Sequence, residues 1–395
     1  MHKKITIGVF VLSLALFFAL TVLVPADANA SVKENRPLAE MPTLSLASWF
    51  SGSFGEDFEE YLSDNVGFRS LFTTIGARLE KLRGFVPEAK GQLVTLPSGG
   101  QLALDDGRIM EVFKANPAAG DSYAATLNRI AATLPDSTNM YLALVPTSIE
   151  FTDSPYGSLS DSEKDTIDAI YSALADITPV HVYGRLEENK DSYVYFRTDH
   201  HWTQRGAYLG YEALMNAMGE EAIPLEDMTK DKQSGFLGYL YNQANVPAYE
   251  QFADDIEYFM PGENYTVHAQ AREDGTIVLY KTKIYTLPSP GALPTYSLFM
   301  GGDHPFARID TDVQNGKCAL IIKDSYANAL IPYLTSHYET ILVIDPRNFY
   351  GTVTDLCGEY EIDDVIVINY VFTTTFPDFI TAIDRITQTH TGGHI

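Results

Sequence analysis

Cysteine is scarce in this 395-residue chain, which contains only Cys318 and Cys357. A framework of several disulfides is therefore excluded, and one bridge between these two residues is the most that the chain allows. An oxidising compartment would permit that bridge. Cys318, however, opens an apolar run that is typical of a buried strand, and this favours two free thiols. No Cys/His spacing resembles a zinc site.

Basic residues are also few. The chain has 27 Lys and Arg residues against 52 Asp and Glu residues, which gives a formal net charge of −25. So acidic a surface repels phosphates and argues against nucleic-acid binding, but it excludes neither a neutral polysaccharide nor a membrane tether. Hydrophobic residues still make up 45% of the chain, enough for a substantial core in one large domain or two smaller ones.

One long uncharged stretch spans residues 5–24 and follows Lys3 and Lys4. The small residues Ala28 and Ala30 lie where a signal peptide would be cleaved, yet twenty apolar residues also suffice to span a bilayer. We therefore expect residues 1–30 to be a signal peptide or a membrane anchor. The lysines before the stretch place the rest of the chain outside the cytoplasm, secreted or anchored to the outer face of the cytoplasmic membrane.

Residues 31–97 have a character of their own. A proline-punctuated lead-in at 34–42 is followed by apolar residues at helical spacing on both sides of a turn at 64–69. This pattern predicts an N-terminal helical tether that packs on the main domain and carries no chemistry.

Strands and helices alternate over residues 98–395. The pattern is typical of a parallel α/β sheet with helices on both faces. Strands are expected at residues 140–145, 180–183, 318–322, 340–344 and 364–368, and helices at 160–175 and 203–218. Between about 231 and 298 the sequence pattern changes. Short runs of β-forming residues there predict an antiparallel β insertion with strands at 256–259, 265–271, 276–282 and 284–287.

Ser325 lies between the strand expected at 318–322 and a helical stretch at 327–336 that Pro332 interrupts. That position is the C-terminal edge of the sheet, where open α/β sheets bind ligands. The N–H groups at the start of the helix could stabilise an oxyanion. Position alone leaves a helix-capping role open for Ser325, and Asp324 could cap equally well.

A serine hydroxyl needs a base to become a nucleophile, and residues 195–206 supply the only histidine-rich cluster. In an extended segment Asp199 and His201 point to the same side, while His200 points away. This spacing predicts that Asp199 orients His201 and that His201 takes the proton of Ser325. A metal site and a purely structural histidine pair are the alternatives, although ligand number and spacing are poor for a metal.

The segment Thr198-Asp199-His200-His201-Trp202 resembles the signature of the DHHW protein family, which is similar to the SGNH-hydrolase-like alginate O-acetyltransferases. The resemblance extends to residues 34–37, 323–326 and 344–347. It implies an SGNH-like α/β domain with Asp199, His201 and Ser325 as a catalytic triad, acyl-ester chemistry through an acyl-serine, and no cofactor or metal. In related polysaccharide O-acetylation systems a membrane-bound acyltransferase hands over the acetyl group, which suits an exported or anchored chain.

Six further residues are candidates for substrate contact. Arg347 follows the strand at 340–344, and Tyr326 and Asn328 flank Ser325. Trp202 would either stack on a sugar or wedge His201 against the core, and the wedge is favoured. Gly302 and Asp303 lie where relatives tend to show Gly-Gly-Asn. An aspartate there would serve an oxyanion badly unless it were protonated or used through its backbone.

These residues together predict an exported, serine-dependent O-acetyltransferase or acetylesterase that acts on a cell-surface or secreted polysaccharide. The alternative is a non-catalytic protein of exopolysaccharide or cell-envelope assembly that keeps the fold and binds glycan. The joint presence of Asp199, His201 and Ser325 favours catalysis.

Overall fold

The computed structural model describes residues 10, 41–45, 48–49, 53–65, 91–96, 98–261, 264–273 and 276–387. The expected signal peptide or anchor lies outside these residues except for Phe10. No helix within the described part of the chain is long and apolar enough to cross a membrane. The chain divides into two compact units, Met1–Glu88 with Tyr241–Gln251, and Ala89–Leu240 with Phe252–Ile395.

One helix of the expected tether is described, α4 (Ser53–Asn65). Its aromatic residues lie at helical spacing, and Phe58 stacks on Phe54 and on Tyr61. The second helix of the predicted tether falls outside the described residues, so the tether remains a prediction.

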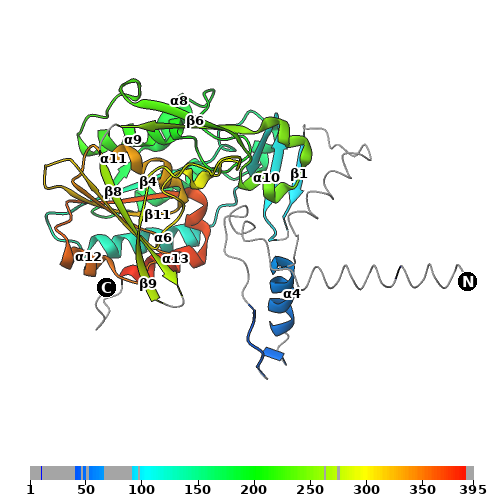
Figure 1. Ribbon diagram of the computed structural model, residues 1–395, viewed down its shortest axis with the longest axis horizontal. Coiled ribbons are helices and arrows are strands. Elements are labelled where there is room, and N and C mark those ends of the chain that lie inside the picture. The colour runs from blue at the N-terminus through cyan, green and yellow to red at the C-terminus, as the bar shows by residue number, and fades with distance from the viewer. Residues whose placement is uncertain are drawn as a thin grey trace, which may run out of the picture. The chain divides into compact units, whose positions relative to one another are not determined.

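An eight-stranded mixed sheet forms the centre of the larger unit (Figure 1). Its strands lie in the order β5-β4-β13-β11-β12-β10-β8-β9. The first five are parallel: β5 (Thr178–Val180), β4 (Asn139–Val145), β13 (Asp364–Tyr370), β11 (Cys318–Lys323) and β12 (Thr340–Ile344). The last three are antiparallel: β10 (Phe306–Thr311), β8 (Tyr265–Glu273) and β9 (Thr276–Thr282).

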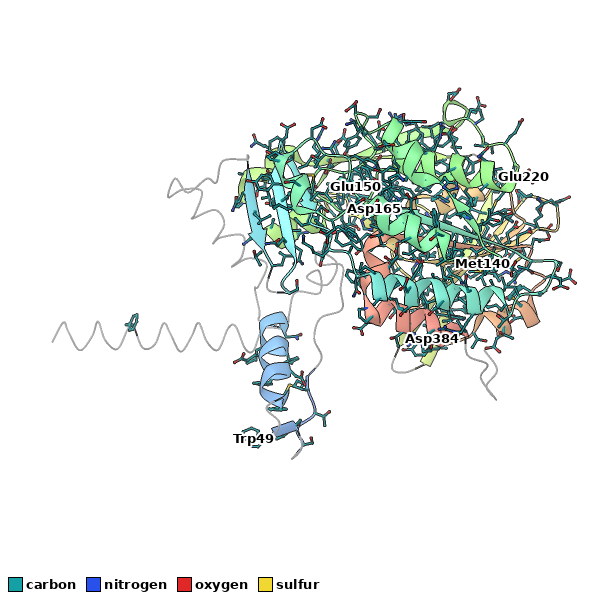
Figure 2. The ribbon with its side chains drawn as sticks, turned by 180° about the vertical axis from the view of Figure 1, so that it is seen from behind. Trp49, Met140, Glu150, Asp165, Glu220 and Asp384 are labelled. Carbon is teal, nitrogen blue, oxygen red and sulfur yellow. The ribbon has the colours of Figure 1, made fainter. Side chains whose placement is uncertain are left out.

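Helices cover both faces of this sheet, because its central strands are apolar on both sides. Along β11, Leu320 and Ile322 face one core, while Ala319 and Ile321 face the other. The first core includes α6 (Pro117–Ala131), α7 (Glu163–Ser172), α12 (Val353–Glu359) and α13 (Pro377–Thr387). The second includes α8 (Val182–Glu188), α9 (Gln204–Met218) and α11 (Ile331–Leu334). Seen from behind in Figure 2, α6 and α13 lie side by side, and Arg129 pairs with Asp384 between them.

The helix-covered α/β sheet and both free thiols agree with the sequence-based predictions. The antiparallel strands do not form a single module, however. β6 (Thr229–Phe236) and β7 (Asp254–Met260) make a separate two-stranded ribbon, whereas β8 and β9 extend the central sheet through β10. The strand expected at 284–287 is only an isolated bridge between Tyr285 and Phe299.

Two other boundaries differ from expectation. The run at 180–183 is split, because β5 ends at Val180 and α8 begins at Val182. The helix expected at 160–175 is shorter, since the Ser162 side chain accepts the N–H of Asp165 and caps α7 there. Helix α9 begins after Thr203 and ends before Gly219, as predicted.

A three-stranded antiparallel sheet was missed. It consists of β1 (Gln92–Thr95), β2 (Gln101–Asp105) and β3 (Arg108–Glu111). Asp106 and Gly107 link β2 to β3, and both have positive φ, at 45° and 75°. Asp-Gly at the centre of a two-residue hairpin is a strong turn signal, so this hairpin was open to prediction.

We predict that Glu163 makes the stability of the protein depend on pH. Its carboxylate is fully buried and accepts the N–H and the hydroxyl of Thr147, each at 2.6 Å. Burial raises the pKa of Glu163 to about 8. Between pH ~4.5 and about 8, the folded state keeps a proton on Glu163 that the unfolded chain releases. The contribution of Glu163 to stability is therefore complete below pH ~4.5 and is lost as pH rises towards about 8, at about 1.4 kcal/mol per pH unit.

Urea unfolding of the wild type and of Glu163→Gln at pH 5, 6, 7 and 8 tests this prediction. The variant should gain on the wild type as pH rises, since an amide can bond both groups of Thr147 without titrating. The exposed Glu187→Gln serves as a control that should follow the wild type. A difference between Glu163→Gln and the wild type that is constant with pH would contradict the prediction.

Candidate active site

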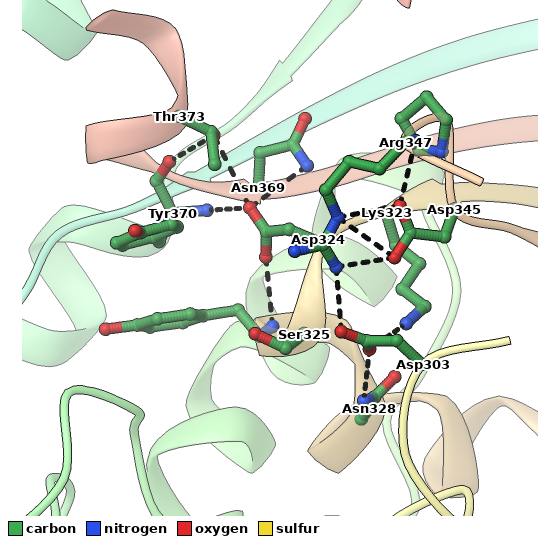
Figure 3. A network of polar contacts seen from close by, with 12 residues as sticks. Asp303, Lys323, Asp324, Ser325, Asn328, Asp345, Arg347, Asn369, Tyr370 and Thr373 are labelled. Atoms are coloured by element: carbon green, nitrogen blue, oxygen red, sulfur yellow. Dashed lines mark hydrogen bonds and ion pairs between the residues drawn. The ribbon is translucent and has the colours of Figure 1, made fainter. Parts of the chain in front are cut away.

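Ser325 begins a 3₁₀ turn, η5 (Ser325–Ala329), directly after the central strand β11. Asp324 caps this turn by accepting the N–H of Tyr326 at 2.9 Å, and it also accepts the N–H of Tyr370 at 2.9 Å (Figure 3). Asp324 therefore takes the capping role, and the hydroxyl of Ser325 is left for another partner. The helix expected at 327–336, with an interruption at Pro332, is not formed: a 3₁₀ turn is followed by the single turn of α11, so the dipole of a long helix does not point at Ser325.

A chain of hydrogen bonds joins Ser325 to His201 and Asp199. His201 Nδ1 lies 2.5 Å from Asp199 Oδ1, and His201 Nε2 lies 2.7 Å from Ser325 Oγ. An ionised carboxylate can only accept, so Nδ1 carries the proton and Nε2 accepts the hydroxyl of Ser325. This is the geometry in which an imidazole can take a proton from a serine.

Asp199 is held as a carboxylate. Burial raises the pKa of Asp199. The neighbouring His201 and His200, together with the hydrogen bonds from His201, lower it by more than burial raises it, so the net pKa lies below the usual range. Oδ1 also accepts the N–H of His201 at 3.0 Å, and Oδ2 accepts the N–H of Tyr239 at 2.6 Å. Both oxygens are thus fixed by donors, and Asp199 can orient the ring of His201.

A second carboxylate, Asp254, fixes the backbone before Asp199. It is fully buried and accepts the N–H groups of Arg197 and Thr198, at 3.1 and 3.0 Å, and the hydroxyl of Thr198 at 2.8 Å. The same hydroxyl oxygen accepts the N–H of Gly238 at 3.1 Å. Sequence reasoning found neither Asp254 nor Gly238, because each contacts this segment from about forty or more residues away in the sequence.

The segment around His201 is bent, which corrects the expected position of His200. A bridge between Tyr195 and Trp202 turns the chain back on itself. The rings of His200 and His201 consequently lie 3.9 Å apart between centroids, and His200 does not point away.

The same bend brings together three side chains that could bind a metal ion. The ligand atoms of Asp199, His200 and His201 lie within 4.8 Å of one another. Both nitrogens of His201 and both oxygens of Asp199 are already engaged, however, so only His200 remains, fewer ligands than zinc sites use. The geometry favours the chain of hydrogen bonds.

Aromatic rings enclose His201. The ring of Tyr296 stacks on it at 3.6 Å between centroids, a contact that sequence reasoning missed. Trp202 donates its indole N–H to the carbonyl of Tyr326 at 2.8 Å, and the hydroxyl of Tyr326 donates to the carbonyl of His200. Trp202 and Tyr326 are fully buried, so they hold the site together and offer no exposed face to a substrate. This agrees with the wedge favoured for Trp202 and differs from the substrate contact expected of Tyr326.

Asp303 lies in a network of charges beside Ser325 (Figure 3). Its carboxylate pairs with Lys323 Nζ at 2.5 Å and with Arg347 at 2.7 Å, and it accepts the side-chain N–H of Asn328 at 2.9 Å. Burial raises the pKa of Asp303, but the charges of Lys323 and Arg347 outweigh burial and hold it below the usual range. Asp303 is therefore ionised, and its side chain cannot donate to an oxyanion.

The network also places the remaining candidates for substrate contact. Asn328 is buried and bound to Asp303, whereas the side chain of Arg347 keeps 43% of its surface exposed. Arg347 also pairs with Asp345 at 2.5 Å. Gly302 is partly exposed and has φ of 108°, a conformation that favours glycine. Of these candidates, Arg347 and Gly302 remain accessible for the predicted contact.

We predict that Asp303→Asn destabilises the protein. Lys323 is nearly fully buried, so a neutral partner would leave its ammonium group without a counter-charge. The free energy of unfolding should fall by about 3 kcal/mol, as for other broken buried pairs. Asp168→Asn breaks the exposed pair with Lys164 and should cost less than about 0.5 kcal/mol. Equal losses in urea unfolding would show that Asp303 does not balance a buried charge.

We also predict that Gly238→Ala disables the base. A Cβ at Gly238 would lie 2.3 Å from the Cβ of Asp199, so the backbone must move and carry the neighbouring N–H of Tyr239 away from Asp199. The reaction of Ser325 with phenylmethylsulfonyl fluoride should slow by roughly 100-fold. Gly184→Ala in α8 meets no atom within 4 Å and should react like the wild type. A Gly238→Ala protein that reacts at the wild-type rate would contradict this role of the close approach.

Known proteins share this architecture. A DHHW family protein from Eubacterium siraeum is 27% identical, with a TM-score of 0.66, and the match covers 74% of this chain and 97% of that one. Bacillus cereus PatB1 is 20% identical, with a TM-score of 0.60 and coverage of 71% and 99%. PatB1 with a sulfonyl adduct matches at 21% identity and a TM-score of 0.60, with coverage of 73% and 97%. No curated protein matches the chain.

The family model described as DHHW protein matches residues 98–344, more than half of the chain. That range contains the Asp199–Trp202 segment and Ser325. The fold is the SGNH-hydrolase-like α/β fold that the sequence predicted. The chain belongs to the DHHW family.

Proposed function

We propose that this protein is an exported, serine-dependent O-acetyltransferase or acetylesterase that acts on a cell-surface or secreted polysaccharide. The observation that carries the proposal is the chain of hydrogen bonds from Asp199 through His201 to Ser325. It lies at the carboxyl edge of the central strand, where α/β sheets place their active sites. The partly exposed Arg347 lies near this edge and is the proposed contact for the substrate.

The proposed reaction has two halves. In the first, Ser325 Oγ attacks the acetyl carbonyl of the donor while its proton passes to His201 Nε2, and His201 then protonates the leaving group as the donor ester bond breaks. Asp199 stabilises the imidazolium that forms. In the second half, a sugar hydroxyl or water loses its proton to His201 and attacks the acetyl-serine, and the proton returns to Ser325 Oγ. The amide N–H of Ser325, at the start of η5, would stabilise the oxyanion.

Two further findings support the proposal. A protein of the same fold, Bacillus cereus PatB1, is known with a sulfonyl adduct, and sulfonyl groups attach to activated nucleophiles. The uncharged stretch at 5–24 suits export. The donor would be an acetyl group handed over by a membrane-bound acyltransferase, as the family resemblance implies. The acidic surface is compatible with a neutral glycan.

Mass spectrometry after exposure to p-nitrophenyl acetate tests the proposal, and it should find an acetyl group on Ser325. Ser325→Ala should carry no acetyl group. Ser325→Ala and His201→Ala should each lower ester hydrolysis by roughly 1,000-fold or more, and Asp199→Asn by a similar factor. The exposed residues Ser122 and His181 provide matched controls, since Ser122→Ala and His181→Ala should retain wild-type rates.

Hydrolysis that persists unchanged in Ser325→Ala and His201→Ala would disprove the proposed triad. A folded wild-type protein that is never acetylated would instead favour the non-catalytic alternative, a glycan-binding protein of cell-envelope assembly.

A further inference from the structure

Three polar atoms near the triad are buried and have no hydrogen-bond partner within the described part of the chain: Nδ1 of His200, Oε2 of Glu111 and Oδ1 of Asn328. The Asn328 amide is already bound to Asp303 through its N–H group, which leaves His200 and Glu111. Buried polar atoms in native proteins are nearly always hydrogen-bonded, and each exception calls for an explanation. The proposed triad uses neither residue. The Glu111 residue is partly exposed, although its Oε2 atom is buried.

The fold brings these two residues to the same place. Glu111 ends strand β3, and that strand is joined to the bent segment because Ile109 donates its N–H to the carbonyl of Arg197 at 2.8 Å. The two groups also interact electrostatically: burial raises the pKa of Glu111, and the neighbouring His200 partly offsets the rise. The missed three-stranded sheet thus delivers a carboxylate to the edge of the site.

His200 lies directly beside the proposed base, with its ring 3.9 Å from that of His201 between centroids. Burial and the neighbouring His201 lower the pKa of His200, so it is a neutral imidazole at neutral pH. A neutral imidazole has one donor and one acceptor nitrogen, while a carboxylate only accepts. The two groups together can satisfy a hydroxyl both as donor and as acceptor.

Aromatic rings surround His200 on several sides. The rings of Tyr239, Tyr370 and Tyr326 lie 5.4, 5.8 and 6.0 Å from it between centroids. A few polar groups set among aromatic rings are typical of sites that bind sugars, because a pyranose has apolar faces and a rim of hydroxyls. A metal is a poorer occupant, since the unused atoms amount to one nitrogen and one carboxylate oxygen.

We infer that Glu111 and His200 form an acceptor subsite, which binds a hydroxyl of the glycan and brings the neighbouring sugar hydroxyl to His201. The inference rests on the proposed function, and it supplies a physical cause for transfer to a sugar in preference to water. When Glu111 and His200 bind one hydroxyl of the glycan, the neighbouring hydroxyl is positioned next to the base, whereas a water molecule reaches the acetyl-serine without this positioning. The two residues thus favour transfer over hydrolysis.

The test measures how the acetyl-enzyme divides between sugar and water. The protein is supplied with p-nitrophenyl acetate and an excess of methyl β-D-glucopyranoside, methyl β-D-galactopyranoside or methyl N-acetyl-β-D-glucosaminide. Acetylated glycoside and free acetate are quantified by NMR, with the background reaction subtracted. Their ratio does not depend on how fast the acetyl-enzyme forms, so a variant that only slows acetylation leaves it unchanged.

We expect Glu111→Gln and His200→Phe each to lower the ratio of transfer to hydrolysis roughly tenfold, the effect of one lost hydrogen bond to a charged or buried group. Glu187→Gln, which changes an exposed glutamate in α8, should keep the wild-type ratio. Unchanged ratios in both variants would overturn the inference, and so would a wild-type acetyl-enzyme that transfers to none of the three glycosides. Absence of acetyl-Ser325 in the wild type would be a failure of the proposed function itself, and mass spectrometry distinguishes the two failures.

Discussion

The hydrogen bond between Asp199 and His201 is the interaction on which the rest of the site depends. It sets the tautomer of His201 and so decides whether Nε2 can accept from Ser325. In a straight strand, Asp199 and His201 would point to the same side, but nothing would fix the backbone between them. Here the chain folds back, and N–H groups from His201 and Tyr239 fix both oxygens of Asp199.

Buried charge is concentrated at one edge of the sheet, and each charge is balanced in a different way. Asp199 is stabilised by histidines and backbone donors, Asp303 by Lys323 and Arg347, and Asp254 by hydrogen bonds from backbone and hydroxyl groups. Isolated buried charges are costly, so such an arrangement persists only where every member is satisfied. The unsatisfied atoms of Glu111 and His200 stand out against this background.

The α/β class and the meeting of Asp199, His201 and Ser325 could be predicted, because they follow from local patterns: β-branched strands, period-two spacing and a serine after a central strand. The bend that brings His200 beside His201 could not, since it depends on long-range bonds to Asp254 and Gly238. The hairpin at Asp106 and Gly107 carried a readable signal. After Ser325, the cap by Asp324 and the break at Pro332 were also readable, whereas the 3₁₀ form of η5 was not.

The carboxylates around Ser325 differ in how firmly they hold their charge. Cationic or imidazole partners keep the pKa of Asp199 and Asp303 low, whereas burial raises the pKa of Asp324 to about 7. Asp324 nevertheless accepts N–H groups from Tyr326 and Tyr370, and a protonated carboxyl would accept them less well. The turn that presents Ser325 is therefore tightest when Asp324 is ionised, which requires a pH above about 7. A rise in pH through this range therefore favours the position of the nucleophile.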